Sequence, residues 1–241
     1  MKIAVVSPKS TQESAQYIAE QLRLWHSDVT YFNPYATRQR ENYDVIVNYG
    51  CSGDAITAPV ILNPPITVGI TVNKLRTFEL LEGLVELPYI TTDKARAIDL
   101  IQVGHEVVIR ETATGSKSAG TTHVDNVESI NNTPAAFYSK YIPHTNEFRI
   151  NCFRGSVLTV QNKTVVGTEF KFKLLNNYQH PQLKEMAQIV HKYIGVDMYG
   201  IDALLDVYGR LVLLEVNSGP ILFGKTSVKM VNAITSYIEA L

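Results

Sequence analysis

The chain of 241 residues is poor in cysteine, nearly free of net charge and without long apolar segments, and each absence excludes a class of protein. Two cysteines, Cys51 and Cys152, are too few for a disulfide framework or a cysteine zinc site, so we expect a reduced, cytoplasmic protein. The formal net charge of −1 provides no general attraction to nucleic acid or to an anionic membrane, and neither partner is predicted. No uncharged apolar run approaches the roughly 18 residues of a membrane-spanning helix.

Several compact catalytic motifs are also absent. The sequence has no G-x-S-x-G nucleophile elbow, no H-E-x-x-H zinc motif and no G-x-x-x-x-G-K-[ST] phosphate loop. No G-x-G-x-x-G sequence follows the first apolar segment. These absences argue against nucleophilic serine chemistry, a compact histidine zinc site and a P-loop.

The first 70 residues or so have the pattern of a small α/β layer. Apolar runs at residues 2–6 and 44–48 predict strands. Between them, apolar residues recur at helical spacing from Ala15 to Trp25, and Ser10-x-x-Glu13 has the form of a capping box. Strand, helix and strand in this order predict a layered α/β unit.

The rest of the chain is dominated by strands joined by tight turns. Four helices are predicted in addition: one from about residue 75 to Gly83, a short one over residues 95–102, one over residues 181–194 with Gly195 as its cap, and one at the C-terminus. The clearest strands are predicted at residues 106–110, 136–142, 147–153, 156–161, 199–205 and 210–216. The fold class expected is therefore α/β (α+β).

A hairpin near the C-terminus gathers acidic side chains. Tyr208-Gly209 suits a two-residue turn, and with that turn Asp202 lies directly opposite Glu215. Asn217 falls on the same face as Glu215, because strand side chains alternate. A four-residue loop would change this register and weaken the argument.

Two carboxylates held this close repel each other unless a cation or a proton lies between them. Three hard oxygen donors without sulfur or imidazole favour Mg²⁺ over zinc or copper. Asp202, Glu215 and Asn217 are therefore candidate metal ligands. The alternative is that the two acids are exposed strand charges and that Asn217 begins a turn.

Two further segments could bind anions. Glu147 and Arg149 share one face of an alternating strand, and Arg149 and Lys163 could serve phosphate or carboxylate groups. A solvated sheet face with a surface ion pair explains the same pattern equally well. Residues 115–120, rich in small and hydroxyl side chains, could turn backbone amides toward phosphates, although a flexible hairpin loop is the better explanation.

Taken in order, these segments resemble the ATP-grasp superfamily. The pair of Asp202 and Glu215-x-Asn217 before a Gly-Pro turn resembles its metal-binding end. The upstream matches are a phosphate-side lysine (Lys74), a Pro-x-x-Thr ending of the first connection (residues 88–91), a second phosphate strand and its glycine-rich flap (Arg110, residues 115–120), the adenine hinge (residues 137–142), the E-x-R element (Glu147, Arg149) and the basic residue of RimK-like glutamate ligases (Lys163).

The resemblance spans about residues 73–225 and is closest in character to the RimK-like group, including short carboxylate–amine ligases of phage type. It implies an ATP-grasp fold with a pre-ATP-grasp α/β domain over residues 1–72. The N-terminal and C-terminal lobes of the ATP-grasp region would cover residues 73–138 and 139–241.

The resemblance further implies an ATP-dependent carboxylate–amine ligase that uses ATP and Mg²⁺ and acts through an acyl phosphate on an amino acid or peptide. The implied metal ligands are the three residues of the hairpin, and the implied catalytic residues are Arg149 and Lys163. The implied nucleotide-binding residues are Lys74, Arg110, Gly115, Ser116, Lys140, Tyr141, Ile142 and Glu147.

Two departures keep other functions open. Arg110 stands where most members have lysine, and residues 165–180 form a short segment that could lack acceptor-binding elements. A MgATP-binding module without ligation would bind the nucleotide but release no substrate-dependent ADP. A small-molecule kinase on the same fold would leave phosphate on its product. The oligomeric state, including a homo-oligomer, also stays open.

Overall fold

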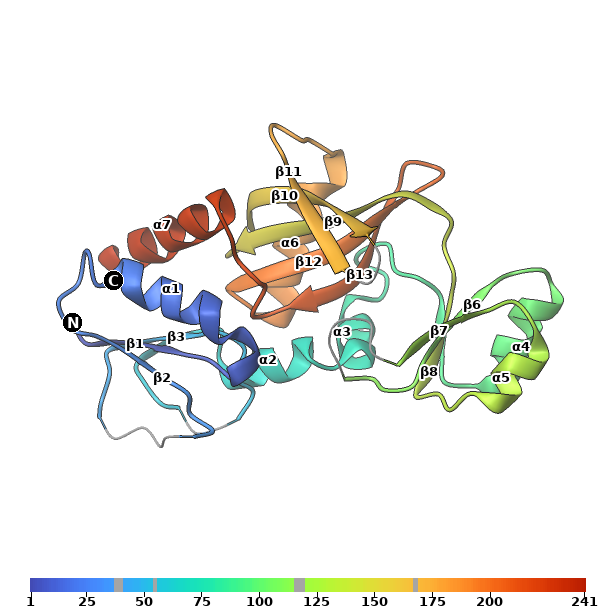
Figure 1. The fold of residues 1–241 in the computed structure, drawn as a ribbon, viewed down its shortest axis with the longest axis horizontal. Helices are drawn as coiled ribbons and strands as arrows, with labels where there is room; N and C mark the ends of the chain where they lie inside the picture. The colour runs from blue at the N-terminus through green and yellow to red at the C-terminus, as the bar shows by residue number, and fades with distance from the viewer. Residues whose placement is uncertain (37–40, 54–55, 115–119, 167–168) are drawn as a thin grey trace.

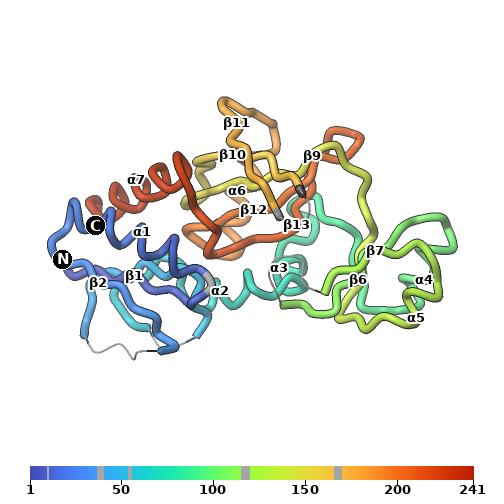
Figure 2. Tube along the Cα trace, viewed as in Figure 1, coloured from blue at the N-terminus to red at the C-terminus, as the bar shows by residue number. Residues whose placement is uncertain are grey.

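A computed structural model describes residues 1–36, 41–53, 56–114, 120–166 and 169–241, whose strands form three sheets. In Figure 1 the N-terminal sheet and the last helix lie at the left, an antiparallel sheet in the middle and a smaller sheet at the right. The two chain termini lie together at the left end, beside helices α1 and α7 (Figure 2). Within the described ranges, no helix is both long enough and apolar enough to cross a bilayer.

The N-terminal sheet is parallel, with the order β2-β1-β3-β4. One of its faces packs against α1 (Gln12–Leu22) and α7 (Lys225–Glu239), so the first and last helices share one core. Two other helices, α2 (Pro65–Thr71) and α3 (Lys74–Leu81), lead to the next part of the chain. The four strands are β1 (Ile3–Val6), β2 (Val29–Phe32), β3 (Val45–Asn48) and β4 (Val60–Leu62).

The start and the end of α1 differ from the prediction. A single 3-10 turn, η1 (Lys9–Thr11), precedes the helix, and the N-cap residue Thr11 makes no side-chain cap bond. Its hydroxyl donates instead to the Tyr49 carbonyl, at 2.9 Å, so a tertiary contact replaces the predicted capping box. The helix ends at Leu22, and Trp25 is therefore 68% exposed instead of continuing the apolar stripe.

The central sheet is antiparallel, with the order β11-β10-β9-β12-β13, and α6 (Pro181–Ile194) covers one face. The helix ends at Gly195, which takes the left-handed conformation at φ 79°, as the sequence predicts. Burial of each large apolar side chain of α6 contributes about 1.5–3 kcal/mol to the free energy of folding. The opposite face of the sheet carries the polar groups of the candidate site. The strands are β9 (His144–Phe153), β10 (Ser156–Val166), β11 (Glu169–Leu175), β12 (Met198–Asp206) and β13 (Leu211–Asn217).

The turn between β12 and β13 is not the predicted two-residue turn. Asp206 N donates to Arg210 O at 3.0 Å, so three residues lie between this pair, with Gly209 left-handed at φ 79°. The ladder beside the turn is consequently shifted by one residue, and Ala203 pairs with Leu213. A bulge at Leu214 then restores the predicted register, in which Asp202 pairs with Glu215. The predicted pairing is confirmed, although the turn proposed for it was wrong.

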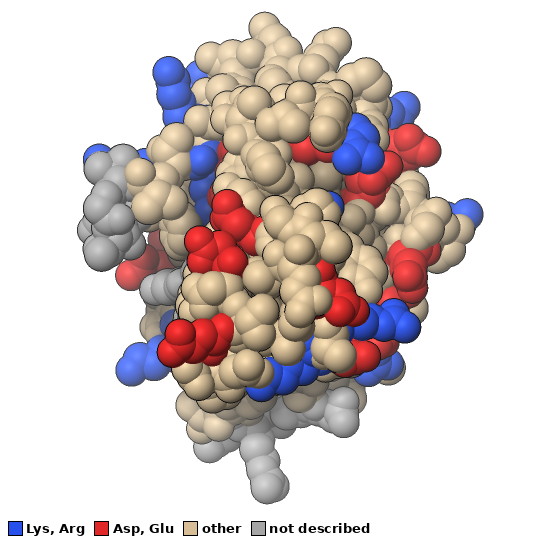
Figure 3. Space-filling model, turned by 90° about the vertical axis from the view of Figure 1, so that its right-hand side faces the viewer, with Lys and Arg blue, Asp and Glu red and all other residues tan. Residues whose placement is uncertain are grey.

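The third sheet has the order β5-β8-β6-β7 and is covered by α4 (Lys94–Gln102) and α5 (Val127–Asn132). Its strands are β5 (Ile90–Thr91), β6 (Val107–Arg110), β7 (Thr121–Val124) and β8 (Phe137–Lys140). Seen from this end, acidic and basic side chains are interspersed over the surface in small groups (Figure 3). The α/β (α+β) class is confirmed, while the boundaries after residues 72 and 138 stay predictions.

Candidate functional site

The candidate site lies on the face of the central sheet opposite α6. Asp202 and Glu215 are paired across β12 and β13, and Asn217 follows Glu215 by two residues on β13. Asp202 is 6% exposed, so it is not one of the exposed strand charges of the alternative interpretation. Gly200 pairs with Asn217 in the same ladder.

Arg149 binds Asp202 from the neighbouring strand β9, where the two residues are directly paired. Its Nε donates to Asp202 Oδ1, and its Nη2 donates to Asp202 Oδ2 at 2.9 Å. Burial alone would lower the pKa of Arg149, but Asp202 and then Glu215 outweigh it and raise the pKa above its ordinary value. Among the described residues Nη1 has no hydrogen-bond partner, so a charged donor stays available for an anion.

Lys163 lies beside this pair on β10. Its Nζ is 3.1 Å from Glu147 Oε2 and 3.5 Å from Asp202 Oδ2. The side chains of Arg149 and Lys163 are 14% and 12% exposed, so they do not form a solvated surface pair. The structure thus brings together Glu147, Arg149 and Lys163 around Asp202.

Two more cations approach Glu215 from outside the central sheet. Lys74, the first residue of α3, places its Nζ 3.0 Å from Glu215 Oε1. Its backbone N donates to Ala113 O at 2.9 Å, which fixes the start of α3 against the end of the β6 segment. Arg110, at the end of β6, donates from Nη1 to Thr121 Oγ1 at 2.5 Å. Burial lowers the pKa of Arg110, and the charge of Glu215 opposes that shift.

Among the described residues, the site therefore has four cationic side chains and three carboxylates, an excess of one positive charge. Lys74, Arg110, Arg149 and Lys163 supply the positive charges, and Glu147, Asp202 and Glu215 supply the negative ones. Cations gathered at low exposure repel each other beyond what three carboxylates can neutralise. A bound polyanion such as a nucleotide phosphate would remove this imbalance.

The donor set at the end of β13 fits Mg²⁺. The Nδ2 atom of Asn217 is buried without a hydrogen-bond partner in the described structure, so no protein group fixes the direction of the carboxamide. Glu215 Oε2 likewise makes no hydrogen bond there. The described residues contain no group of three His, Cys, Asp or Glu side chains suited to a metal, so a cation here would also need the carboxamide and phosphate oxygens.

The predicted adenine hinge leaves one backbone donor open. Lys140 N and Tyr141 N donate to Tyr89 O and Glu106 O, both at 2.9 Å. The Ile142 amide donates to none of the described residues. The rings of Tyr141 and His144, which flank this residue in the sequence, lie 6.0 Å apart between their centroids. The Lys140 side chain points to His105, 3.0 Å from Nζ to Nε2. Gly115 and Ser116, the other predicted nucleotide contacts, lie outside the described residues.

Two phenylalanines of β11 complete the site and were missed in the sequence. The Phe170 ring lies 4.5 Å from Lys163 Nζ, and the Phe172 ring lies 5.4 Å from Arg149 Cζ. Aromatic faces attract cations at these distances and restrict their side chains. The signal was the alternation of phenylalanine and lysine over residues 170–173, typical of a strand with one face packed.

Gly200 is a second missed residue. A Cβ at this position would come within 3.0 Å of both Arg149 Cδ and Pro220 Cβ. The glycine therefore lets the Arg149 side chain cross β12 at close range. A glycine within a strand pattern is the sequence signal for such an approach.

A buried asparagine joins the N-terminal sheet to this site. Asn63 accepts at Oδ1 from Asp197 N and Met198 N, at 2.7 and 2.8 Å. Its Nδ2 donates to Met198 O and Ser218 O, at 2.7 and 3.0 Å. All four hydrogen-bonding positions of the carboxamide are filled, and Ser218 directly follows the candidate metal ligand Asn217.

No family model matches this sequence, and no curated protein matches it. Solved structures do match it over nearly the whole chain. The D-alanyl-alanine synthetase A of Vibrio cholerae O1 biovar eltor matches with a TM-score of 0.74 and 16% identity, over 98% of each chain. A RimK domain ATP-grasp protein of Sphaerobacter thermophilus matches with a TM-score of 0.72 and 13% identity, over 98% of this chain and 99% of its own.

The ATP-grasp ligase PsnB, in complex with a minimal precursor, Mg and ADP, also matches with a TM-score of 0.72 and 13% identity. The match covers 99% of this chain and 96% of PsnB. At such identities the likeness establishes the architecture. The chain has the ATP-grasp fold, as the order of its motifs predicts.

Proposed function

We propose that this protein is an ATP-dependent carboxylate–amine ligase of RimK-like character, which forms an amide bond through an acyl phosphate on an amino acid or peptide. The observation that carries the proposal is the cluster of four cations around three carboxylates and an unpartnered carboxamide, at the polar face of an ATP-grasp sheet. Proteins of the same fold include a D-alanyl-alanine synthetase and a ligase solved with Mg and ADP.

The nucleotide would lie between the hinge and the cation cluster. The open Ile142 amide would donate to the base, and Lys74 and Arg110 would bind phosphates that displace their contacts with Glu215 and Thr121. We assign Glu147 to the ribose hydroxyls. On the sequence alone, Lys140 and Tyr141 belong to the same hinge, and Gly115 and Ser116 belong to the phosphate flap.

Glu215 and Asn217, with Asp202 behind them, would hold Mg²⁺. Bound there, the ion would neutralise phosphate charge during transfer. Asp202 would also position Arg149, because both of its carboxylate oxygens accept hydrogen bonds from that side chain. The same carboxylate therefore orients the guanidinium toward the reacting groups.

In the reaction, a substrate carboxylate oxygen would attack the γ-phosphorus, the bond to the β,γ-bridging oxygen would break, and ADP would leave. An amine would then attack the acyl carbon, lose a proton and expel phosphate as the C–N bond forms. Arg149, whose Nη1 has no hydrogen-bond partner in the described part of the chain, and Lys163 would stabilise the charge on the acyl phosphate and on the tetrahedral oxyanion. Because the pKa of Arg149 is raised, it stays charged throughout.

ADP release tests this function. The protein is incubated with MgATP and with panels of amino acids, short peptides and a small-molecule cell extract. ADP release is measured, and the masses of the products are determined by mass spectrometry. Glu215→Gln should abolish substrate-dependent release, whereas the exposed Glu239→Gln on α7 should leave it intact. A product that retains phosphate would indicate a kinase, and MgATP binding without release would indicate a binding module. Absence of MgATP binding would refute the proposal altogether.

We also propose a cytoplasmic location and small-molecule or peptide partners. Cys51 and Cys152 are both free thiols, which agrees with a reducing compartment. The phage-type subgroup rests on the short chain and its motifs alone.

A further inference from the structure

A cavity lies between α1 and the start of α7, next to the candidate site. It has a volume of about 770 Å³ and is lined by Glu13, Ser14 and Tyr17 of α1 and by residues 221–225 and 227–229. Pockets of about 300–1,000 Å³ with mainly apolar walls are typical of small-molecule sites. The lining segment begins at Ile221, and only residues 218–220 separate it from the candidate metal ligand Asn217.

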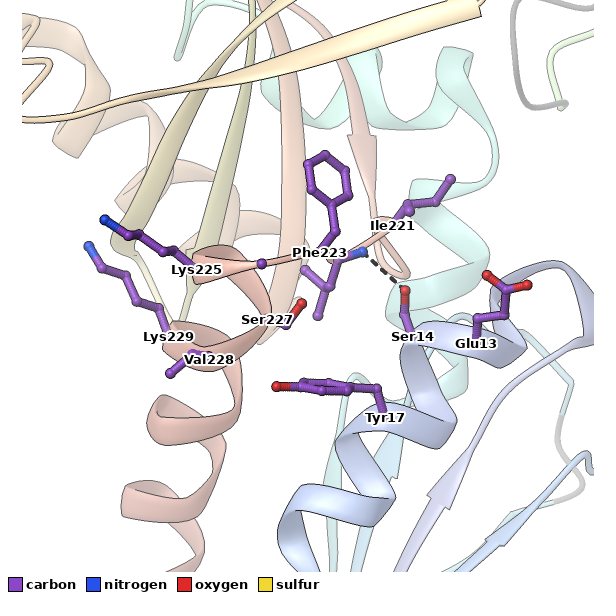
Figure 4. Close-up of a pocket in the computed structure, with 11 residues that line it drawn as sticks. Glu13, Ser14, Tyr17, Ile221, Phe223, Lys225, Ser227, Val228 and Lys229 are labelled. Carbon is purple, nitrogen blue, oxygen red and sulfur yellow. Dashed lines mark hydrogen bonds between the residues drawn. The ribbon is translucent and has the colours of Figure 1, made fainter.

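The middle of the cavity is apolar and its charges lie at the edges. Ile221, Phe223 and Val228 are 55%, 43% and 49% exposed, and all three line this cavity. Figure 4 shows the Tyr17 ring below Phe223 and Ile221, with Glu13 on one side of the cavity and Val228 on the other. Lys225 and Lys229 extend together on the other side, away from Tyr17 (Figure 4). Exposed apolar side chains clustered in this way mark a surface that binds an apolar group.

The floor of the cavity is buried, and a hydrogen bond joins its two sides. Ser14 accepts a hydrogen bond from Leu222 N at 3.0 Å, drawn as the dashed line in Figure 4. Ser14, Leu222 and Ser227 are 6%, 8% and 4% exposed, so they form the floor beneath the exposed apolar groups. The apolar walls are therefore present before any ligand arrives.

An aromatic connection leads from the cavity to the catalytic cation. Phe223 lines the cavity, and its ring centroid is 6.0 Å from that of Phe172. Phe172 in turn covers the Arg149 guanidinium, 5.4 Å from the ring to Cζ. Phe223 and Arg149 therefore both border the Phe172 ring, so one small molecule could place an apolar group against the cavity wall and an anionic end at Arg149 Nη1, which has no hydrogen-bond partner among the described residues.

We propose that this cavity selects the carboxylate substrate and favours an amino acid or peptide whose reacting end carries a large apolar side chain. This inference rests on the proposed ligase function for the reaction and on the cavity for the preference. The carboxylate matches the charge of Arg149, and the side chain matches the walls formed by Ile221, Phe223 and Val228. One methylene group in an apolar pocket changes selectivity by about 10- to 200-fold, so the preference over glycine should be large.

The test uses N-acetyl-L-phenylalanine and N-acetylglycine, which present the same carboxylate and differ only in the side chain. Binding of each to the full chain is measured by calorimetry with a non-hydrolysable ATP analogue and Mg²⁺. Turnover is measured with MgATP and hydroxylamine, which converts an acyl phosphate to a hydroxamate and releases phosphate. N-acetyl-L-phenylalanine should bind at least about ten-fold more tightly and give more hydroxamate.

Val228→Asp places a charge in the cavity and should remove this preference without changing nucleotide affinity. Val103→Asp, at a 70% exposed position beyond α4, is the matched control and should behave as wild type. Ile221→Ser is a second cavity variant at a more exposed position, in case Val228→Asp unfolds. Selective binding without hydroxamate or ADP would overturn the ligase function and support the cavity. Equal binding of both probes, no binding of N-acetyl-L-phenylalanine, or cavity variants that keep the preference would overturn the cavity proposal even if ligation occurs.

Discussion

Replacement of Asp202 by asparagine should destabilise the ligand-free protein through Arg149. The change keeps the shape of the side chain but removes the negative charge that accepts two hydrogen bonds from Arg149. It also removes the charge 3.5 Å from Lys163, so the excess of positive charge in the site rises from one to two. Leaving a buried charge without its partner typically costs about 3–5 kcal/mol.

We expect the lower end of that range, about 3 kcal/mol, because the amide oxygen of asparagine still accepts one hydrogen bond and Lys163 keeps Glu147. For a chain of this size each kcal/mol shifts the melting temperature by about 2–4 °C, so the expected decrease is about 6–12 °C. The measurement is thermal unfolding without nucleotide, followed by circular dichroism. Glu41→Gln breaks an exposed pair with Lys2 of similar length, 2.8 Å, and should cost less than about 1 kcal/mol.

A double-mutant cycle separates this explanation from a general loss of packing. Arg149→Met removes the cation, so the further change of Asp202 to asparagine should then cost much less than it does alone. We expect a coupling of about 2–3 kcal/mol, within the range for residues that share a hydrogen-bond network. A melting temperature within about 2 °C of wild type for Asp202→Asn, or strictly additive losses in the cycle, would refute the reasoning.

Four smaller predictions concern groups around the site. Phe172→Leu keeps an apolar side chain but removes the aromatic face over Arg149, so kcat/KM should decrease about two- to five-fold, for about 0.5–1 kcal/mol; an unchanged value in steady-state kinetics would contradict this. Gly200→Ala should lower kcat more than nucleotide affinity, because its Cβ would meet Arg149 Cδ at 3.0 Å; equal losses of both, measured by kinetics and calorimetry, would be evidence against this cause. Asn63→Ala should lower the free energy of unfolding by at least about 2 kcal/mol in urea titrations, since two buried amides lose their acceptor. Asn63→Asp keeps that acceptor but sets a buried carboxylate oxygen against the Met198 and Ser218 carbonyls, so it should cost at least as much, and a smaller loss than for Asn63→Ala would contradict this. Burial raises the pKa of the Cys51 thiol to about 12, so thiolate is scarce and iodoacetamide at about pH 8 should alkylate this residue only after denaturation, as read by mass spectrometry.

The carboxylate hairpin shows how a sequence can predict a pairing for an incomplete reason. Tyr208-Gly209 has the composition of a two-residue turn, but Asp206 accepts from the backbone amides of Tyr208 and Arg210 and so favours the longer loop. The extra loop residue shifts the ladder, and the bulge at Leu214 shifts it back. A bulge has no strong composition signal, so the two deviations could not be read separately from the sequence.

The order of the motifs predicted which side chains lie together in the site, whereas the order of the strands in the sheet and the N-cap of α1 were harder to predict. Strands at residues 147–153 and 199–205 were recognisable, yet nothing local shows that β9 lies between β10 and β12 and so pairs Arg149 with Asp202. The position of the edge strand β11, which carries Phe170 and Phe172, depends on the same long-range order. Thr11 likewise bonds to Tyr49, a contact between residues far apart in the sequence, and this contact replaces the local cap.

The separate core of the β5–β8 sheet has a consequence for how the molecule opens. Its buried apolar side chains form a cluster of their own, made in the described structure of Ala97, Val107, Ile109, Val124, Ile130 and Tyr138. So small a cluster supports little local stability, and amide hydrogens of β6 and β7 should exchange with solvent sooner than those of β9 and β12. Arg110 ends β6, and the predicted hinge consists of β8 and the two residues after it. A nucleotide bound to both and to the central sheet would therefore connect the sheet that exchanges sooner to the one that exchanges later. Protection of β6 against hydrogen exchange is thus a direct readout of whether the two lobes have been joined.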